Sequence, residues 1–160
     1  MRHLWAPWRL KYIRGKKEGG CIFCKRLRRR RDRADLILHR DKNCFVILNR
    51  FPYNSGHLMV VPNRHTGRFE TLTNEEGKGL FRLVRYSVKA LRRLYKAEGF
   101  NVGMNVGQAA GAGITGHLHL HVVPRWRCDT NFMPVLAATR GVPEYLDETF
   151  LRLKKVWRVR

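Results

Sequence analysis

The sequence predicts a single α+β domain built on an antiparallel sheet, and three patterns support this prediction. Short apolar runs, bounded by Pro, Asn, Ser and Gly, indicate three strands and a hairpin within residues 36–62. A helical period of apolar residues follows, and two further strand-like runs, "FNVGMNVG" and "HLHLHVVPRW", come after it. Because 160 residues suit one compact domain and no repeat or long linker interrupts them, we expect one domain spanning residues 1–160.

Two helices are predicted from apolar spacing. The main helix begins after Thr73, which forms a capping-box pattern with Glu76, and we expect Gly99 to end it. A second helix is expected within residues 143–157. The apolar stripe of the main helix comprises Leu80, Leu83, Val84, Val88, Leu91 and Leu94, and that of the second comprises Tyr145, Leu146, Thr149, Phe150, Leu153 and Trp157.

Three stretches of different composition make up the domain. Residues 1–35 form a basic N-terminal arm with a Cys-x-x-Cys pair, in which "KRLRRRRDR" fits either a frayed helix or an open loop. Residues 36–125 hold the five expected strands and the main helix, and we interpret them as the catalytic core. Residues 126–160 form a C-terminal extension that contains the second helix.

The charge of the chain is strongly one-sided. Lys and Arg number 33 against 12 Asp and Glu, which gives a formal net charge of +21. This excess is too large for a network of surface ion pairs, so it points to polyanionic partners, either nucleotides with several phosphates or nucleic acid. A solvated basic face that only keeps the protein soluble explains the charge about as well.

The sequence shows no sign of membrane insertion or export. No apolar run approaches the length of a membrane span, and "MRHLWAPWRLKYI" lacks the apolar core of a signal peptide. We therefore expect a cytoplasmic protein with no membrane partner. In that compartment the four cysteines are expected to be thiols or metal ligands rather than disulfides.

The run "GHLHLHVVPR", residues 116–125, contains three histidines at alternate positions. On a strand, His117, His119 and His121 would share one face while the intervening apolar residues pack on the other. Three neighbouring imidazoles in a structural role would each need a partner to offset desolvation, so nucleophilic catalysis or metal binding is favoured. The preceding "GQAAGAG" offers backbone N–H groups that can approach phosphate oxygens, which favours nucleotide chemistry.

Two motifs carry a resemblance to a known family. "HLHLHVV" fits the pattern His-φ-His-φ-His-φ-φ, with φ apolar, and "LNRFPYNSGHLMVVPNRH" is similar to a nucleotide-binding hairpin. Together they resemble the histidine triad (HIT) family of nucleotide hydrolases and transferases, over most of residues 20–125. "LWAPWRLKYI" and "VVPRWRCDTNFMPV" resemble the microbial branch that includes diadenosine tetraphosphate phosphorylases. The resemblance implies a five-stranded antiparallel sheet that continues into a second copy across a homodimer.

The resemblance also implies a catalytic mechanism. His119 would attack the α-phosphorus of a nucleoside polyphosphate, such as diadenosine tetraphosphate, and form a nucleotidyl-histidine that passes to phosphate or water. His121 and His57 would contact the α-phosphate oxygens, where negative charge must be held in the transition state.

Further residues are expected around the substrate. By resemblance, Asn49 would contact the ribose and Asn105 the phosphate, although both also suit ordinary turn or strand-end positions. Many relatives place a serine three residues before the first histidine, where this chain has Ile114. The candidates for the leaving-phosphate contact are therefore Thr115 and the backbone of Gly111 and Gly113.

Two residues directly after the histidine run are candidates for the rim of the active site. They are Arg125 and Trp126, and the indole would stack on a base. A dimer-interface or core position explains the indole at least as well.

The spacing of Cys21 and Cys24 is that of half a zinc site. In some members of the family, and in related uridylyltransferases, two histidines complete the site, and the matching positions here are His65 and His117. Four protein ligands would make the zinc structural, and a metal-free thiol pair is the alternative. No organic cofactor is expected. Of the other cysteines, we expect Cys44 in the core and Cys128 as a lone thiol.

Three other functions remain open at this point. One is hydrolysis of a nucleoside phosphoramidate by the same chemistry. Another is a nucleotide- or nucleic-acid-binding protein with little turnover, which the basic stretches 28–31 and 152–160 keep open. The third is a catalytic metal held by the three histidines.

Overall fold

The protein folds around a five-stranded sheet in which every neighbouring pair of strands is antiparallel. The computed structural model describes residues 19–127, 129 and 144–158. The strand order is β1-β2-β3-β5-β4, with β1 at one edge and β4 at the other. The predicted α+β class and the three strands expected within residues 36–62 are confirmed. The strands are β1 (Ile37–Arg40), β2 (Cys44–Leu48), β3 (Leu58–Pro62), β4 (Gly99–Met104) and β5 (Leu120–Arg125).

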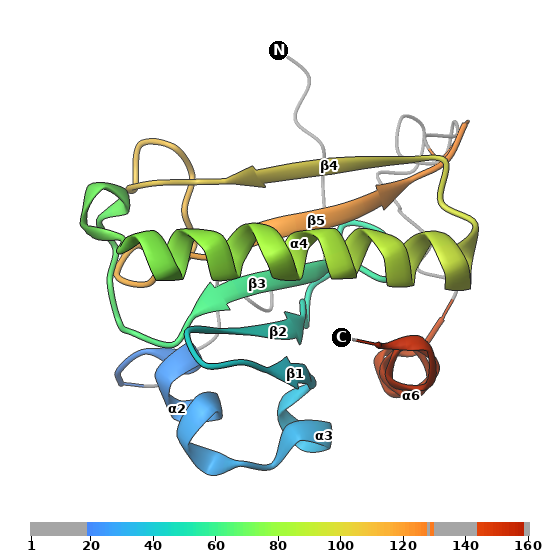
Figure 1. The fold of residues 1–160 in the computed structure, drawn as a ribbon, viewed down its shortest axis with the longest axis horizontal. Coiled ribbons are helices and arrows are strands. Elements are labelled where there is room, and N and C mark those ends of the chain that lie inside the picture. Colours follow the sequence, from blue (N-terminus) through green and yellow to red (C-terminus); the bar gives the residue numbers. More distant parts are fainter. Residues whose placement is uncertain (1–18, 128, 130–143, 159–160) are drawn as a thin grey trace.

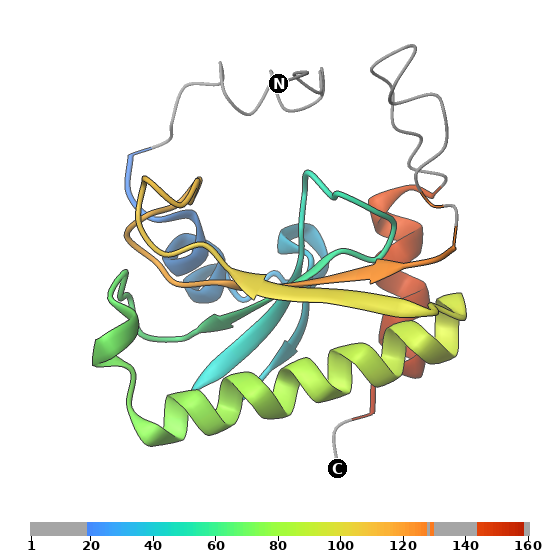
Figure 2. The same ribbon diagram turned by 90° about the horizontal axis from the view of Figure 1, so that it is seen from above.

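Helices surround the sheet, and one of them covers most of a face. Figures 1 and 2 show α4 lying across one face, while the loop between β2 and β3 and the loop between β4 and β5 rise from the other. In Figure 2 these two loops and α2 all lie on the side of the sheet away from α4. The helices are α2 (Ile22–Arg29), α3 (Asp32–Asp35), the short 3₁₀ helix η1 (Phe69–Thr71), α4 (Asn74–Tyr95) and α6 (Leu146–Val156).

The start of α4 agrees with the predicted capping box. The Thr73 hydroxyl accepts from the backbone N–H of Glu76 at 3.2 Å, and the Glu76 carboxylate accepts from the Thr73 N–H at 2.9 Å. The predicted end at Gly99 is wrong. The helix stops at Tyr95 because Lys96 adopts a left-handed conformation with φ 52°, and Gly99 already belongs to β4.

The core lies mainly between the sheet and the two longer helices. All five residues of β2 and all five of β3 are buried, because both faces of these central strands are covered. Cys44 is fully buried, as predicted. In α6, Phe150 and Leu153 are buried, but the expected packing of Tyr145 is wrong, since this residue precedes the helix as its N-cap and is 82% exposed.

The basic stretch after the cysteine pair is helical, forming α2 and α3. Phe23 anchors α2 with a fully buried ring, which offsets the repulsion among the exposed arginines of this stretch. Arg40 of β1 ties the two helices together, because its Nε donates to Asp32 Oδ1 at 2.8 Å and its Nη1 donates to the carbonyl of Leu27 at 2.6 Å. Cys128 and the N-terminal "LWAPWRLKYI" lie outside the described residues.

Within the described part of the chain, no helix is long and apolar enough to cross a membrane.

Candidate functional site

The three in-line histidines meet at the beginning of β5. The prediction that all three lie on the strand needs correction, because β5 begins at Leu120, so only His121 belongs to it and His117 and His119 precede it. His121 stands opposite Met59 of β3 and Gly103 of β4 in the sheet register. The ring of His119 lies 5.0 Å from that of His121, centroid to centroid. The structure therefore brings these two imidazoles together on the face opposite α4.

The hydrogen bonds of His119 determine which of its nitrogens can react. Its Nδ1 lies 2.8 Å from the backbone oxygen of His117, and a carbonyl only accepts, so Nδ1 is assigned the proton. The Nε2 atom then keeps its lone pair. Burial lowers the pKa of His119, since desolvation disfavours the imidazolium, and the hydrogen bond to the carbonyl opposes this shift. His119 is therefore neutral at pH 7, as a nucleophile must be.

His57 and His121 form a relay with a defined direction. The backbone N–H of Tyr53 donates to His57 Nδ1 at 3.1 Å, so the neutral ring of His57 carries its proton on Nε2. That Nε2 lies 2.9 Å from His121 Nδ1 and donates to it, which leaves the proton of His121 on its Nε2. Burial first, and then the neighbouring imidazoles of His121 and His119, lower the pKa of His57 to about 3. These two hydrogen bonds leave an N–H donor on Nε2 of His121, whose ring lies next to that of His119 with its free Nε2.

The loop before His57 is held by its own hydrogen bonds and by contact with α4. Asn49 Oδ1 accepts from the N–H of Phe51 at 2.9 Å, and Asn49 Nδ2 lies 3.3 Å from His57 Nδ1. Gly56 has φ 80°, and a Cβ there would lie 2.8 Å from Leu91 Cδ2 of α4. The left-handed φ together with this close approach favours glycine at residue 56, and the turn places His57 directly before β3.

A cavity of about 90 Å³ lies against His119 and His121. It also contains four other residues expected from the sequence, so the predicted phosphate side and the predicted ribose residue share one space. The remaining lining residues extend this space with apolar and basic side chains. The expected residues are Asn49, Asn105, Gly111 and Gly113, and the others are Ile22, Arg26, Arg50, Phe51, Tyr53, Met59 and Ile114.

Three predicted substrate residues lie elsewhere. Thr115 is exposed and does not line the cavity, and Trp126 donates from Nε1 to the carbonyl of Tyr95 at 3.1 Å. Trp126 lines a larger hollow of about 590 Å³ that contains none of the histidines. Arg125 donates from Nη2 to Asp129 Oδ1 at 2.6 Å, and it lines a hollow of about 310 Å³ that shares Tyr53, Asn105 and His121 with the neighbouring space.

Several residues of the site were not predicted from the sequence. Ile22 and Arg26 lie four apart on α2, so one helical face carries both into the cavity. Phe23 is fully buried, and its ring lies 5.3 Å from that of His117 and 5.2 Å from that of His119. The apolar spacing within "CIFCKRL" is a signal for this face, but it only becomes informative once the segment is known to be helical.

A second cluster unites the four residues expected to bind zinc. Their ligand atoms all lie within 4.8 Å of one another. His117 Nδ1 is 3.2 Å from Cys21 Sγ, 3.6 Å from Cys24 Sγ and 3.2 Å from His65 Nδ1. Cys24 Sγ is 3.4 Å from His65 Nδ1. Residues separated by more than ninety positions in the chain thus converge on one point.

The cluster fits a tetrahedral zinc ion in both distance and donor chemistry. Zn–S and Zn–N bonds of about 2.3 and 2.0 Å imply ligand separations of roughly 3.3–3.8 Å, close to the four separations of 3.2–3.6 Å given above. The Nε2 atom of His117 donates to the carbonyl of Pro62 at 2.9 Å, so Nδ1 faces the cluster with its lone pair. Burial lowers the pKa of His117, which keeps the imidazole neutral and able to coordinate.

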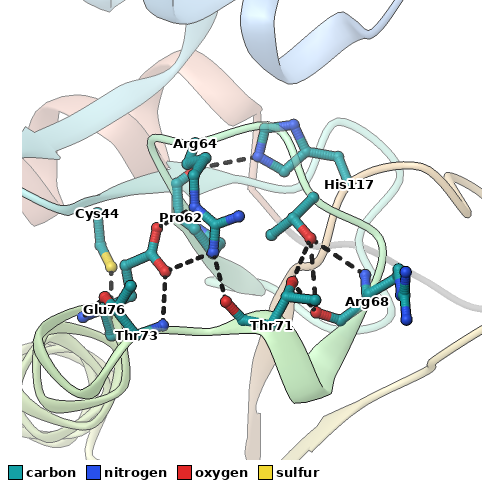
Figure 3. A network of polar contacts seen from close by, with 9 residues as sticks. Cys44, Pro62, Arg64, Arg68, Thr71, Thr73, Glu76 and His117 are labelled. Atoms are coloured by element: carbon teal, nitrogen blue, oxygen red, sulfur yellow. Dashed lines mark hydrogen bonds and ion pairs between the residues drawn. The ribbon is translucent and has the colours of Figure 1, made fainter.

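The segment that carries His65 is fixed at both ends. Figure 3 shows Arg64 reaching to the start of α4, where Nε and Nη2 donate to the two oxygens of Glu76 at 2.9 and 2.8 Å, and His117 reaching to Pro62. On the other side of His65, a Cβ at Gly67 would lie 2.4 Å from the carbonyl oxygen of Thr115. The two segments of the chain that carry His65 and His117 are therefore in direct contact.

Comparisons with known proteins agree with this arrangement. The profile of the HIT domain matches residues 30–127. The AP-4-A phosphorylase of Mycobacterium tuberculosis is 33% identical over 165 residues, covering 98% of this chain and 85% of that protein. The asymmetrical bis(5'-nucleosyl)-tetraphosphatase of Schizosaccharomyces pombe is 31% identical over 93 residues, covering 58% of this chain and 50% of that one.

A solved structure provides the same comparison in three dimensions. The crystal structure of a Zn-bound histidine triad family protein from Mycobacterium smegmatis superimposes with a TM-score of 0.71 at 27% sequence identity. It covers 86% of this chain, and this chain covers 93% of it.

Proposed function

Because this chain belongs to the HIT domain family, we propose that it is an enzyme that cleaves a nucleoside polyphosphate, with diadenosine tetraphosphate as the substrate. One observation carries the proposal. His119 has Nδ1 tied to a backbone carbonyl and contributes to a cavity beside His121, so its unprotonated Nε2 is available to a bound phosphate. The AP-4-A phosphorylase similar to this chain supports the substrate class.

The reaction proceeds in two displacements. The lone pair of His119 Nε2 attacks the α-phosphorus, the bond from that phosphorus to the bridging oxygen breaks, and ATP leaves. The adenylate is then held on His119 through a phosphorus–nitrogen bond. Inorganic phosphate or water attacks the same phosphorus, the phosphorus–nitrogen bond breaks, and the product is ADP or AMP. His119 regains its lone pair.

The α-phosphate is held by groups already set in place. His121 donates from Nε2 to a phosphate oxygen, and the His57 relay keeps that proton on Nε2. The backbone of Gly111 and Gly113 approaches the phosphates from the other loop, and Asn105 lies on the same side. Arg125 would contribute from the adjoining hollow, whereas Thr115 and Trp126 have no place in this cavity.

Cys21, Cys24, His65 and His117 hold a structural zinc ion in this proposal. Four protein ligands leave no open position, so the ion stabilises the fold and supplies no reactive water. The fit of the donor atoms and the Zn-bound relative from Mycobacterium smegmatis support it. The Cys-x-x-Cys pair thereby joins α2 to the start of β5.

A homodimer joined through β4 completes the proposal. Within the described residues β4 pairs on one side only, with β5, and Val102 at its middle is 47% exposed. An open edge with an exposed apolar residue suits pairing with a second copy. Sedimentation of the wild type and of Val102→Lys tests this, since a dimer that uses β4 should dissociate in the variant.

Incubation of the purified protein with diadenosine tetraphosphate, with and without inorganic phosphate, tests the function directly. Chromatography of the products gives ADP plus ATP for a phosphorylase and AMP plus ATP for a hydrolase. Acid-quenched protein analysed by mass spectrometry should carry an adenylate on His119. No cleavage and no adduct under either condition would contradict the proposal, and turnover of an adenosine phosphoramidate alone would replace its substrate.

A further inference from the structure

The outward side of α4 carries a continuous row of basic side chains that the proposed reaction does not use. Between residues 77 and 97 the sequence contains seven basic residues and no acidic one. All seven are exposed. We define this row as the α4 stripe: Lys78, Arg82, Arg85, Lys89, Arg92, Arg93 and Lys96.

The spacing of the stripe makes it straight. Successive members follow at intervals of four or three residues, apart from the adjacent pair Arg92 and Arg93, and an average of about 3.5 residues keeps side chains on one side of a helix. At about 1.5 Å per residue, charges recur roughly every 5 Å, and the 22-residue helix is about 33 Å long. The stripe, from residue 78 to residue 96, thus spans about 27 Å, which is most of the ~34 Å of one turn of a DNA duplex.

Most of the stripe lacks a carboxylate partner. Lys78 pairs with Glu75 and Arg82 with Asp41, but in the described part of the chain none of the other five takes part in an ion pair. Arg85 and Lys89 lie 5.8 and 6.0 Å from the ring centre of Tyr86, and such contacts leave the positive charge intact. Four of the five also line a shallow hollow of about 530 Å³, namely Lys89, Arg92, Arg93 and Lys96.

We propose that the α4 stripe binds the phosphate backbone of duplex DNA without sequence preference. A row of unpaired positive charges complements a backbone with one negative charge about every 3.4 Å per strand. Single-stranded nucleic acid is less well matched, because its binding sites use aromatic stacking platforms, and Phe81 is the exposed aromatic residue of α4. An anionic membrane is also less well matched, since apart from Phe81 this side of the helix exposes no large apolar side chain.

The stripe and the nucleotide cavity lie on opposite sides of the sheet. Figure 2 shows α4 below the strands and the loops of the cavity above them. A duplex on α4 would therefore leave the entrance to His119 open. This inference is independent of the proposed cleavage of nucleoside polyphosphates.

The salt dependence of binding to a short DNA duplex of random sequence tests the proposal. With five phosphates neutralised, the logarithm of the association constant should fall against the logarithm of salt concentration with a slope of about −4 to −5. Replacing Arg85, Lys89, Arg92 and Lys96 together by Gln should weaken binding more than ~10-fold and reduce the slope by about 3 to 4. Gln is a good helix former, so α4 should persist, which circular dichroism and the thermal midpoint would verify.

A matched control removes the same charge elsewhere. The variant with Arg28, Arg29, Arg31 and Arg33 replaced by Gln also loses four exposed basic residues, and it should retain most of the affinity and slope. If both variants lost the same affinity for the duplex, net charge alone would explain the binding and the proposal would be overturned. A stripe variant that binds the duplex like the wild type would also overturn it. Tighter binding to phosphatidylserine vesicles than to the duplex, at equal phosphate concentration, would also overturn it. Cleavage of diadenosine tetraphosphate should be unchanged in the stripe variant.

Discussion

His117 and His119 lie two residues apart in one motif, yet they enter two clusters with different chemistry. His117 donates from Nε2 to the carbonyl of Pro62, and its Nδ1 faces the two thiols and His65. His119 donates from Nδ1 to the carbonyl of His117, and its ring lines the cavity with Nε2 free. In the proposed function, the ring nitrogen that a backbone carbonyl occupies thus decides whether a histidine of the motif serves as a metal ligand or as a nucleophile.

Removal of the nucleophile should produce the largest effect and separate the two clusters most clearly. In His119→Ala we expect kcat for diadenosine tetraphosphate to fall by about 10⁴-fold or more, because His121, the other imidazole that lines the cavity, carries its proton on Nε2 and has no lone pair there to form the intermediate. The adenylate adduct should disappear in mass spectrometry. Zinc content should stay at the wild-type value, and a parallel loss of metal would show that the two clusters are not separable.

The proposed zinc site can be tested separately with His65→Ala, which removes one of its four ligands. This variant should lose bound zinc and about 2–3 kcal/mol of stability, which lowers the thermal midpoint by roughly 4–12 °C in a domain of this size. Activity should fall by about 10–100-fold, because the carbonyl of His117 and the ring of Phe23 link this cluster to His119. Metal analysis and calorimetry provide the measurements. His39→Ala, at a half-buried histidine outside both clusters, is the control, and an equal loss of stability there would remove the case for zinc.

The relay between His57 and His121 offers a third, smaller test. His57→Ala removes the donor that fixes the tautomer of His121, and we expect kcat to fall by about 10²-fold with little change in zinc content. Stopped assays of product formation would measure this. An unchanged kcat would mean that His121 holds its proton on Nε2 without help.

The pH profile should report the neutral nucleophile. Burial lowers the pKa of His119 below its usual 6.5, and only the unprotonated ring can attack. The value of kcat/KM should therefore stay level as pH falls from 8 and decline only below pH 6.5. An acid limb centred above pH 6.5 would contradict the assignment. Phosphate ionises in the same range, so the hydrolytic reaction or a fixed concentration of the reactive phosphate form is needed.

Loss of the ion pair between Arg64 and Glu76, next to His65 in the chain, should give the smallest effect. Arg64 lowers the pKa of Glu76 to about 2, from an ordinary 4.5, through its hydrogen bonds to the carboxylate. The pair therefore adds stability that is complete above pH 4.5 and is lost as pH falls towards 2. Arg64 is 45% exposed, so we expect only about 1 kcal/mol. Denaturant unfolding should show a weaker acid dependence for Glu76→Gln between pH 5 and 2, and identical curves would dismiss the pair.

The parts of the fold that local signals specify were predictable. Thr73 and Glu76 carry a complete capping box, and the strand runs within residues 36–62 alternate with turn residues, so both were read correctly. The end of α4 was not predicted, because Lys96 adopts a left-handed conformation that glycine usually occupies, and a lysine in the sequence gives no signal of it. The helical state of the arginine-rich stretch depends on the burial of Phe23, which is a tertiary contact.

The candidate site follows the same division. The motif drew attention to the three histidines, and the structure places His119 and His121 at one cavity and His117 among the cysteines. The motif does not reveal which nitrogen each ring exposes. Arg26 and Arg50 enter the cavity from α2 and from the loop after β2, and no pattern in the sequence links these positions. Trp126 was placed near the rim because of its proximity to His121 in sequence, whereas its indole turns towards Tyr95.

The contact between Gly67 and the carbonyl of Thr115 has a consequence for how the protein matures. It holds the segments of His65 and His117 together through backbone atoms alone, with no room for a side chain between them. The fold itself therefore brings the ligand atoms of these two histidines together, whereas Cys21 and Cys24 reach the cluster from α2. If zinc binds there as proposed, the histidine half of its site forms with the sheet, and completion of the site depends on the docking of α2.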